Sequence, residues 1–192
     1  MRFFYFVIVL LALSSFAFAS DEKKNYDKAE AYRISKVCAG CHGMNGAAPG
    51  HSIPIIGGQK SSYVEKTMVE FRDGKRYGTV MKKIALAYDD SRAKLVGEYF
   101  ADQKWVNTRE KVDKSLILLG KKLSKECADC HGKNGKGDEG NPRIAGQHPL
   151  YLEHALYEYK EGKRGDVSEM DLIKNMTDKQ IKALAAYFAS IK

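Results

Sequence analysis

The chain has 192 residues and a formal net charge of +8, with 44% hydrophobic and 29% charged residues. These fractions are ordinary for a soluble globular protein, and they exclude a disordered tail, a collagen-like repeat and a polytopic membrane protein. Four cysteines are too few for a disulfide-dense miniprotein, which would also be much shorter. The cysteines therefore need another explanation.

The first 19 residues have the pattern of a secretory signal peptide. Arg2 gives the start a positive charge, residues 3–13 are apolar throughout, and Ala17-Phe18-Ala19 fits a small-x-small cleavage site. An uncleaved N-terminal anchor is the alternative, but the apolar stretch is shorter than the roughly 20 residues that a transmembrane helix needs. We therefore expect residues 1–19 to be a signal peptide and the mature protein to be periplasmic.

The remaining sequence contains one unit twice. Cys38-Ala39-Gly40-Cys41-His42 recurs 89 positions later as Cys127-Ala128-Asp129-Cys130-His131. Other pairs recur at offsets of 88 or 89, among them Pro54 and Pro142, Gly58-Gln59 and Gly146-Gln147, Gly74-Lys75-Arg76 and Gly162-Lys163-Arg164, and Tyr99-Phe100-Ala101 and Tyr187-Phe188-Ala189. A copy of this size often needs a cofactor or a metal to complete its core. The repeat predicts two domains, 20–106 and 107–192, joined near the polar run 102–113.

The distribution of helix formers and helix-stop residues predicts an all-α protein. Helices are expected over residues 27–37, 62–72, 114–126 and 150–161. The last helix of each copy has one apolar face, and Asp89-Asp90-Ser91 and Thr177-Asp178 supply candidate N-caps for these helices. The Gly-rich stretches 43–58 and 132–146 are expected to be loops. No strong alternating pattern requires a sheet.

The motif Cys-x-x-Cys-His is the attachment signature for c-type haem. Two thiols about one helical turn apart can form thioethers with the two vinyl groups of the porphyrin, and the adjoining histidine can bind the iron. Two occurrences in register behind a signal peptide predict two covalently bound haem c groups. The cofactor-binding residues would be Cys38, Cys41, His42, Cys127, Cys130 and His131.

Three other roles for the cysteines fit less well. A zinc site that joins the two pairs is disfavoured by the spacing of 86 positions from Cys41 to Cys127. A thioredoxin-like redox motif would need a βαβ context, which the helical pattern lacks. Disulfides would leave the two histidines that follow the motifs unexplained.

Each haem iron needs a second axial ligand or an open site, and methionine and histidine are common ligands. Met81 and Met170 both lie 39 positions after the histidine of their motif, which gives the chain enough length to pass around the porphyrin edge. Met44 follows its motif too closely, and Met68 and Met176 have no matching methionine in the other copy, so both are expected in the core. The predicted metal ligands are His42, Met81, His131 and Met170.

The other histidines, His51, His148 and His154, have no counterpart in the other copy and are expected at the surface or partly in the core. Pro54 and Pro142 begin similar turns. A histidine that binds a metal usually donates its second ring N–H to a nearby acceptor, so a carbonyl in each turn is a candidate acceptor. Stiffening of the loop is the alternative role for these prolines.

Each copy resembles a class I cytochrome c domain, and the tandem resembles the dihaem cytochrome c4 family. The similarity runs from Tyr26 to Ile191 and includes the Gly-to-Met segments 74–81 and 162–170. The resemblance implies His–Met ligation, bonds from the ligating histidines to the Pro54 and Pro142 carbonyls, domains related by a pseudo-two-fold, and haem propionates near their interface. The dihaem subunit of flavocytochrome sulfide dehydrogenases is similar to nearly the same degree. The copies differ at Lys60 and His148, which we expect to affect the partner surface more than ligation.

Three functions are compatible with these motifs. The first is a periplasmic electron carrier between redox partners of a respiratory chain, without catalytic residues. The second is an electron-accepting subunit of a flavoprotein dehydrogenase such as sulfide dehydrogenase. The third is a dihaem peroxidase, which would need one open iron and is disfavoured because both candidate methionines are present at equal spacing.

The basic residues are spread evenly over both copies. No compact Lys/Arg cluster with interleaved aromatic residues indicates binding to nucleic acid. The charge is better suited to steering toward an acidic redox partner or a membrane surface. Expected partners are redox proteins such as a membrane-bound oxidase, a reductase or a flavoprotein dehydrogenase, and peripheral association with a membrane stays open.

Overall fold

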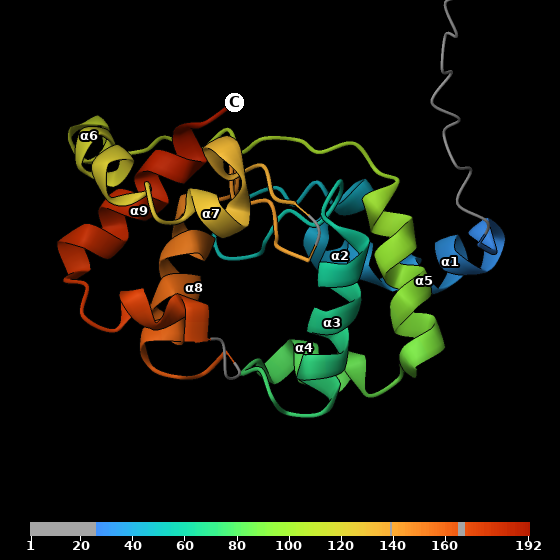
Figure 1. Cartoon of the computed structure of the whole chain (residues 1–192). Helices are drawn as coiled ribbons and strands as arrows, with labels where there is room; N and C mark the ends of the chain where they lie inside the picture. The colour runs from blue at the N-terminus through green and yellow to red at the C-terminus, as the bar shows by residue number, and fades with distance from the viewer. Residues whose placement is uncertain (1–25, 139, 165–167) are drawn as a thin grey trace, which may run out of the picture.

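The computed structural model describes residues 26–138, 140–164 and 168–192 (Figure 1). The signal peptide predicted for residues 1–19 lies outside this part of the chain. Within the described residues the structure is helical apart from loops and turns, and the one strand-like feature is an isolated antiparallel bridge between Arg76 and Arg164. None of the described helices is long and apolar enough to cross a membrane. The predicted all-α fold class is confirmed.

In the N-terminal half, residues 26–106, the first and the last helix begin with acidic caps. The Asp27 carboxylate accepts from the Glu30 N–H, and the predicted N-cap Asp89 accepts from the Arg92 N–H. The described elements of this half are α1 (Lys28–Ser35), η1 (Lys36–Cys38), α2 (Ala39–His42), η2 (Met44–Gly46), α3 (Ser61–Arg72), α4 (Thr79–Ala85) and α5 (Asp90–Ala101).

The C-terminal half, residues 107–192, repeats this order. Its last helix begins with a capping box, in which the Thr177 hydroxyl accepts from the Gln180 N–H and the Gln180 side chain accepts from the Thr177 N–H. The described elements are α6 (Lys114–Leu123), α7 (Ala128–His131), η3 (Lys133–Gly135), α8 (Pro149–Lys160), η4 (Ser168–Ile173) and α9 (Asp178–Ser190).

Each half has its own hydrophobic cluster. In the N-terminal half the buried side chains come mainly from α1, α3 and α5, including Ile34, Val64, Met68, Phe71, Val96 and Phe100. In the C-terminal half they come mainly from α8, η4 and α9, including Leu152, Ile173, Ile181, Leu184 and Phe188. Met68 therefore packs in the core, as expected, and Met176 lies partly buried against the second cluster.

The first and last helices of the C-terminal half cross very closely at Gly120. A Cβ atom at this position would overlap the Ala183 carbonyl of α9 and press on the Tyr187 side chain. The matching residue of the N-terminal half is Ala31, which is fully buried on α1. The glycine thus permits a closer contact between the α6 and α9 backbones than an alanine at this position would allow.

Two short helices were not predicted from the sequence. The helix α4 and the 3-10 helix η4 both lie between the Gly-Lys-Arg segment and the last helix of their half, where no helix was expected. Helices this short are not stable alone, so their formation depends on packing against the rest of the fold. The helix predicted over 27–37 also ends early, because the chain tightens into η1 before the first Cys motif.

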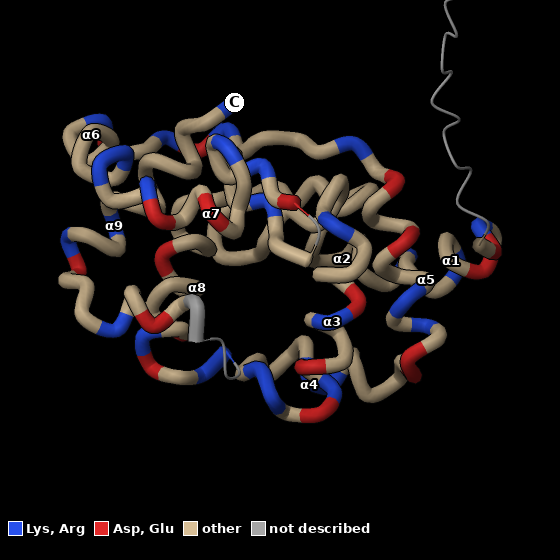
Figure 2. Tube along the Cα trace, in the orientation of Figure 1, with Lys and Arg blue, Asp and Glu red and all other residues tan. Residues whose placement is uncertain are grey.

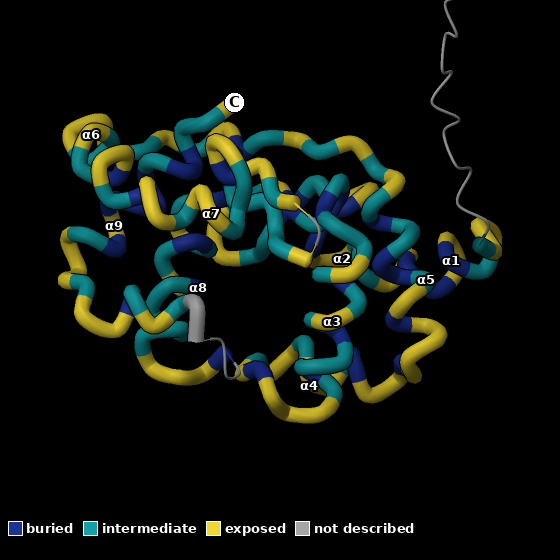
Figure 3. The backbone as a smooth tube through the Cα atoms, viewed as in Figure 1, coloured by how far each residue is buried: buried dark blue, intermediate teal, exposed yellow. Residues whose placement is uncertain are grey.

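The two halves lie side by side, and residues 102–113 run between α5 and α6 along one edge (Figure 1). Basic and acidic residues are both scattered over the two halves in Figure 2, in agreement with the even spread of charge in the sequence. Figure 3 shows buried backbone both inside each half and in the loops where the halves meet. The exact domain boundaries, 20–106 and 107–192, stay a prediction.

Candidate functional site

Both Cys-x-x-Cys-His motifs have the same local structure. Cys38 ends η1, and Cys41 and His42 lie in the short helix α2; in the other half, Cys130 and His131 lie in α7. Gly43 and Gly132 then end these helices with φ angles of 72° and 69°. This left-handed conformation turns the chain sharply after the histidine, and only glycine adopts it without strain.

The two motif histidines make the same hydrogen bond. His42 Nδ1 lies 2.8 Å from the Pro54 carbonyl oxygen, and His131 Nδ1 lies 2.9 Å from the Pro142 carbonyl oxygen. Because a carbonyl only accepts, Nδ1 carries the proton and Nε2 keeps its lone pair. Burial lowers the pKa of both imidazoles, although the carbonyl bonds act in the opposite direction. Both rings are therefore set up as neutral ligands, and both contacts implied by the resemblance are present.

The first cysteine of each motif does not have the character of a reactive thiolate. All four are free thiols. Burial raises the pKa of the Cys38 and Cys127 thiols to about 11, which keeps them protonated near neutral pH. Redox-active cysteines instead have lowered pKa values. These two thiols therefore do not have the lowered pKa that a thiol–disulfide exchange site needs.

The structure brings one candidate methionine of each half to the cluster that its first motif cysteine contacts. Met81, on α4, and Cys38 both pack against the cluster of the N-terminal half. Met170, in η4, and Cys127 both pack against the cluster of the C-terminal half, which Met176 also contacts. Burial does not separate Met170 from Met176, so the choice of Met170 rests on its match to Met81 in the repeat.

Two buried arginines that the sequence analysis left without a role face each other across the halves. Arg76 and Arg164 are only 5% and 6% exposed and form the antiparallel bridge. Arg164 Nε is paired with Glu158 at 2.6 Å, and both guanidiniums contact the Tyr151 hydroxyl. Burial alone would raise the pKa of the Tyr63 phenol beside them, but the charges of the two guanidiniums outweigh it and lower that pKa. The region therefore has an excess of buried positive charge.

This charge excess and the motifs together fit a haem. Arg76 Nε is buried and has no hydrogen-bond partner among the described residues, so the region is suited to an anionic group. A haem carries carboxylates as well as an iron and two vinyl groups. The free thiols, the neutral imidazoles and the buried arginines are thus consistent with one covalently attached haem in each half.

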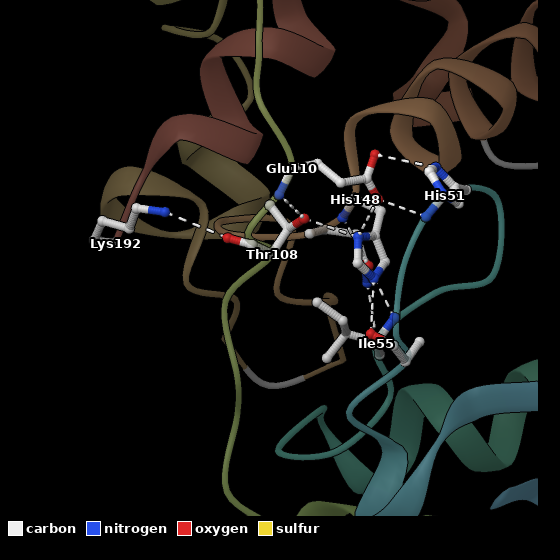
Figure 4. Close-up of polar contacts among 8 residues, drawn as sticks. His51, Ile55, Thr108, Glu110, His148 and Lys192 are labelled. Atoms are coloured by element: carbon white, nitrogen blue, oxygen red, sulfur yellow. Dashed lines mark hydrogen bonds and ion pairs between the residues drawn. The ribbon is translucent and has the colours of Figure 1, made fainter.

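His148, expected at the surface or partly in the core, is instead a buried residue of the contact between the halves (Figure 4). It is 2% exposed; its Nε2 donates to the Ala48 carbonyl at 3.1 Å, and its Nδ1 lies 2.7 Å from Glu110 Oε1 and 2.8 Å from Thr108 Oγ1. The expectation that His148 affects a partner surface was therefore wrong. Its polar neighbours come from a loop of the other half and from the linker, which no pattern in the local sequence indicates.

The other two spare histidines are exposed, in line with the expectation. His51 donates its backbone N–H to Glu110 Oε1 at 2.5 Å, and its ring lies 3.7 Å from Glu110 Oε2 (Figure 4). His154 lies on the exposed side of α8. Neither is brought to the motif histidines by a hydrogen bond among the described residues.

Comparisons with known proteins match these features over both halves. The family model for cytochrome c matches residues 117–192. Cytochrome c4 of Pseudomonas aeruginosa is 28% identical over 200 residues, which cover 96% of each chain. The thiosulfate dehydrogenase electron acceptor of Stutzerimonas stutzeri is 31% identical, over 96% of this chain and 92% of that protein. The crystal structure of reduced recombinant cytochrome c4 from Pseudomonas stutzeri superposes with a TM-score of 0.80 at 24% identity, covering 88% of this chain and all of that one.

Proposed function

Because this chain belongs to the cytochrome c4 family of dihaem electron-transfer proteins, we propose a specific haem site in each half. Cys38, Cys41 and His42 would hold one haem c, and Met81 would be the second protein ligand of its iron. The corresponding set in the other half is Cys127, Cys130, His131 and Met170. When bound, the haems supply one-electron redox chemistry that no side chain of this protein provides. Residues 20–106 and 107–192 would be the two haem domains.

The protein's own residues orient and protect these ligands. The Pro54 and Pro142 carbonyls fix the ring orientation and the tautomer of the two histidines. His42 is only 8% exposed, so water has little access to it. A dry site with fixed ligands is suited to electron transfer, because the surroundings need little rearrangement between oxidation states.

The protein is an electron carrier rather than an enzyme. The observation that carries the ligand assignment is the equivalence of the two halves. Each has a motif histidine bonded to a proline carbonyl, buried in the case of His42 and half-buried in that of His131, and a methionine packed on the same cluster as its first motif cysteine. A peroxidase would need one half to lack its distal ligand. The matching halves support a distal methionine for both haems, which would leave neither iron open to peroxide.

We also propose a cellular compartment and a class of redox partner for this protein. We place the protein in the periplasm after removal of residues 1–19, in keeping with c-type cytochromes of this family. Its partners are redox proteins. The similarity to an electron acceptor of thiosulfate dehydrogenase supports a role as the acceptor for a dehydrogenase, alongside that of a free carrier that delivers electrons to an oxidase. A flavoprotein such as sulfide dehydrogenase is the alternative donor.

The proposal is tested by counting and titrating the haems of the purified protein. We expect two covalent haems per chain, low-spin spectra and a methionine-to-iron charge-transfer band in the oxidised form. A high-spin fraction with peroxide turnover would support the peroxidase instead. Absence of covalent haem would overturn the proposal.

A groove on the C-terminal half is a candidate docking surface for an acidic redox partner. It has a volume of about 460 Å³ and lies between α6, α7, η3 and α9. Leu118, 79% exposed, and the side chains of Tyr187 and Phe188 make its apolar part. Its four lysines form no ion pair with a described carboxylate: Lys121, Lys122, Lys125 and Lys133. An acidic surface with a small apolar contact is complementary to this groove.

The matching surface of the N-terminal half has fewer lysines. At the position of Lys121 it has Tyr32, whose ring packs on Tyr99 with the centroids 6.1 Å apart. Lys36, the match of Lys125, lies over the Tyr32 ring at 5.4 Å instead of on a groove rim. The lysine-lined surface is thus a property of the C-terminal half, and we assign it to partner docking.

Charge reversal of two groove lysines tests this assignment. The variant Lys121→Glu with Lys125→Glu is expected to slow reduction by flavodoxin hydroquinone, an acidic one-electron donor, about tenfold at low ionic strength. The difference should shrink in high salt, because salt screens the exposed charges. Stopped-flow absorbance gives the second-order rate constants.

The matched control changes the same net charge on the other half. Lys36→Glu with Lys94→Glu should slow the reaction much less. Equal slowing by both variants would show that only the overall charge matters. Strong binding of the wild type to phosphatidylglycerol vesicles with no effect of the groove variant on the rate would contradict protein docking and indicate a membrane surface.

A further inference from the structure

The repeated Gly-Gln motif connects the two halves through crossed hydrogen bonds. Gln147 Oε1 accepts from the Ile55 N–H at 2.9 Å, and Gln147 Nε2 donates to the Ile55 carbonyl at 2.8 Å. In the opposite direction, Gln59 Oε1 accepts from the Arg143 N–H at 2.7 Å, and Gln59 Nε2 donates to the Arg143 carbonyl at 2.9 Å. Each glutamine therefore binds the backbone of the other half.

The bound residues are the ones that follow the two prolines. The Pro54 carbonyl and the Ile55 N–H belong to one peptide group. The carbonyl side accepts from His42 Nδ1 and the N–H side donates to Gln147, so the three groups form one chain of hydrogen bonds. The same chain runs from His131 through the Pro142–Arg143 peptide group to Gln59. Each ligand histidine is thus linked to a glutamine of the opposite half.

The two amides are held firmly in this orientation. Gln59 and Gln147 are 4% and 2% exposed. Each Oε1 also accepts the N–H of the next residue, Lys60 or His148, at 3.0 Å. With two N–H donors on the oxygen and a carbonyl facing the nitrogen, a flipped amide would leave buried polar groups unpaired. Figure 4 shows Ile55 beside His148, where the halves meet.

Hydrogen bonds in a chain polarise one another. When the Ile55 N–H donates to Gln147, the Pro54 carbonyl oxygen becomes more negative and accepts more strongly from His42. A stronger bond to Nδ1–H makes the imidazole more basic, which stabilises the ferric state and lowers the reduction potential of the haem that it binds.

We propose that Gln147 is a positioning residue for His42, and Gln59 for His131, so that each half tunes the haem of the other. This inference rests on the proposed function, since it takes His42 and His131 as the haem ligands. It assigns a role to the Gly-Gln repeat that ligation alone does not require. The pairing also explains why the motif occurs in both copies, because each glutamine serves the opposite site.

Single substitutions to leucine test the crossed pattern. Leucine is similar in size to glutamine but forms no hydrogen bond and does not bind iron. Gln147→Leu is expected to raise the potential of the N-terminal haem, so that its ratio of reduced to oxidised form at a fixed potential increases about two- to fivefold. The C-terminal haem should not change. Gln59→Leu should produce the mirror result. Spectroelectrochemical titration measures both.

Substitutions at other residues show which redox transition of the titration, or wave, belongs to which haem, and they provide a control. Met81→His and Met170→His should each shift one wave and thereby identify it. Gln103→Leu removes a half-buried amide that donates to the Tyr99 carbonyl oxygen at 2.8 Å. Because this bond lies within the N-terminal half and involves neither proline peptide group, its loss should change neither potential. If Gln147→Leu fails to attach haem, the shorter Gln147→Asn keeps a polar group but withdraws from Ile55, and it should give the same direction of shift.

The possible outcomes distinguish a failure of the proposed haem sites from a failure of the crossed glutamine roles. If wild-type protein lacks two haems, or if neither methionine variant moves a wave, the proposed function itself fails. If those results are as expected but Gln147→Leu shifts the C-terminal haem, both haems equally or neither, the crossed positioning is wrong. NMR of the His42 Nδ1–H resonance gives a second readout, and it should move upfield in Gln147→Leu if its hydrogen bond weakens.

Discussion

Replacing Met81 with histidine is expected to lower the reduction potential of one haem and leave the other unchanged. A thioether ligand favours the ferrous state, so that His–Met ligation has a higher potential than His–His ligation. Axial ligands span a range of about 0.8 V, and we expect a decrease on the order of 0.2 V for this change. Met170→His should have the same effect on the other haem, and each variant should lose half of the methionine-to-iron band.

The control for this result is Met176, which packs against the same cluster as Met170. Met176→Leu should leave both potentials and the charge-transfer band unaltered. Redox titration with visible spectra measures all three variants. If Met176→Leu lowers a potential while Met170→His does not, the distal ligand of the C-terminal half has been assigned to the wrong methionine.

Replacing both cysteines of one motif is expected to halve the haem content. Cys127→Ser with Cys130→Ser removes the covalent attachment in the C-terminal half, where Cys127 packs against the hydrophobic cluster. A half of about 85 residues buries too little apolar surface to be robust without its cofactor. We therefore expect one haem per chain, together with a loss of helix content and a lower melting temperature.

The matched variant is Cys38→Ser with Cys41→Ser, which should remove the other haem. Pyridine haemochrome spectra against protein concentration give the stoichiometry, and circular dichroism gives the helix content. Retention of two covalent haems by either variant would contradict the attachment assignment. Loss of both haems from either variant would show that the halves fold as a single unit, contrary to the proposed two domains.

Local features of this protein could be predicted because their causes are local. The caps Asp89 and Thr177 satisfy backbone N–H groups a few residues away, so their sequence neighbourhood contains the whole interaction. The Cys-x-x-Cys-His motifs similarly span five consecutive residues each, and their last four residues form a short helix. The repeat added a second source of predictions, because each residue could be compared with its counterpart in the other copy. Met68, for example, has no matching methionine and was therefore expected in the core.

Other features were missed because their partners lie far along the chain. His148 has neither a matching histidine nor a recognisable motif, and its burial depends on Ala48, Thr108 and Glu110. Arg76 was visible only as part of a repeated segment, whereas the structure places it opposite Arg164 with an Nε that forms no hydrogen bond to a described residue. A buried charge of this kind is defined by distances across the fold and not by sequence spacing.

The sequence by itself determined the chemistry of the protein: four cysteines in two attachment motifs, a histidine beside each and a methionine at equal spacing. These depend on residue type and on short separations along one chain. Only the tertiary structure decided how the halves are joined. Gln59 and Gln147 bind backbone groups more than 80 positions away, and a backbone amide has the same hydrogen-bonding groups in every residue, so no side-chain pattern identifies which peptide group a glutamine will bind.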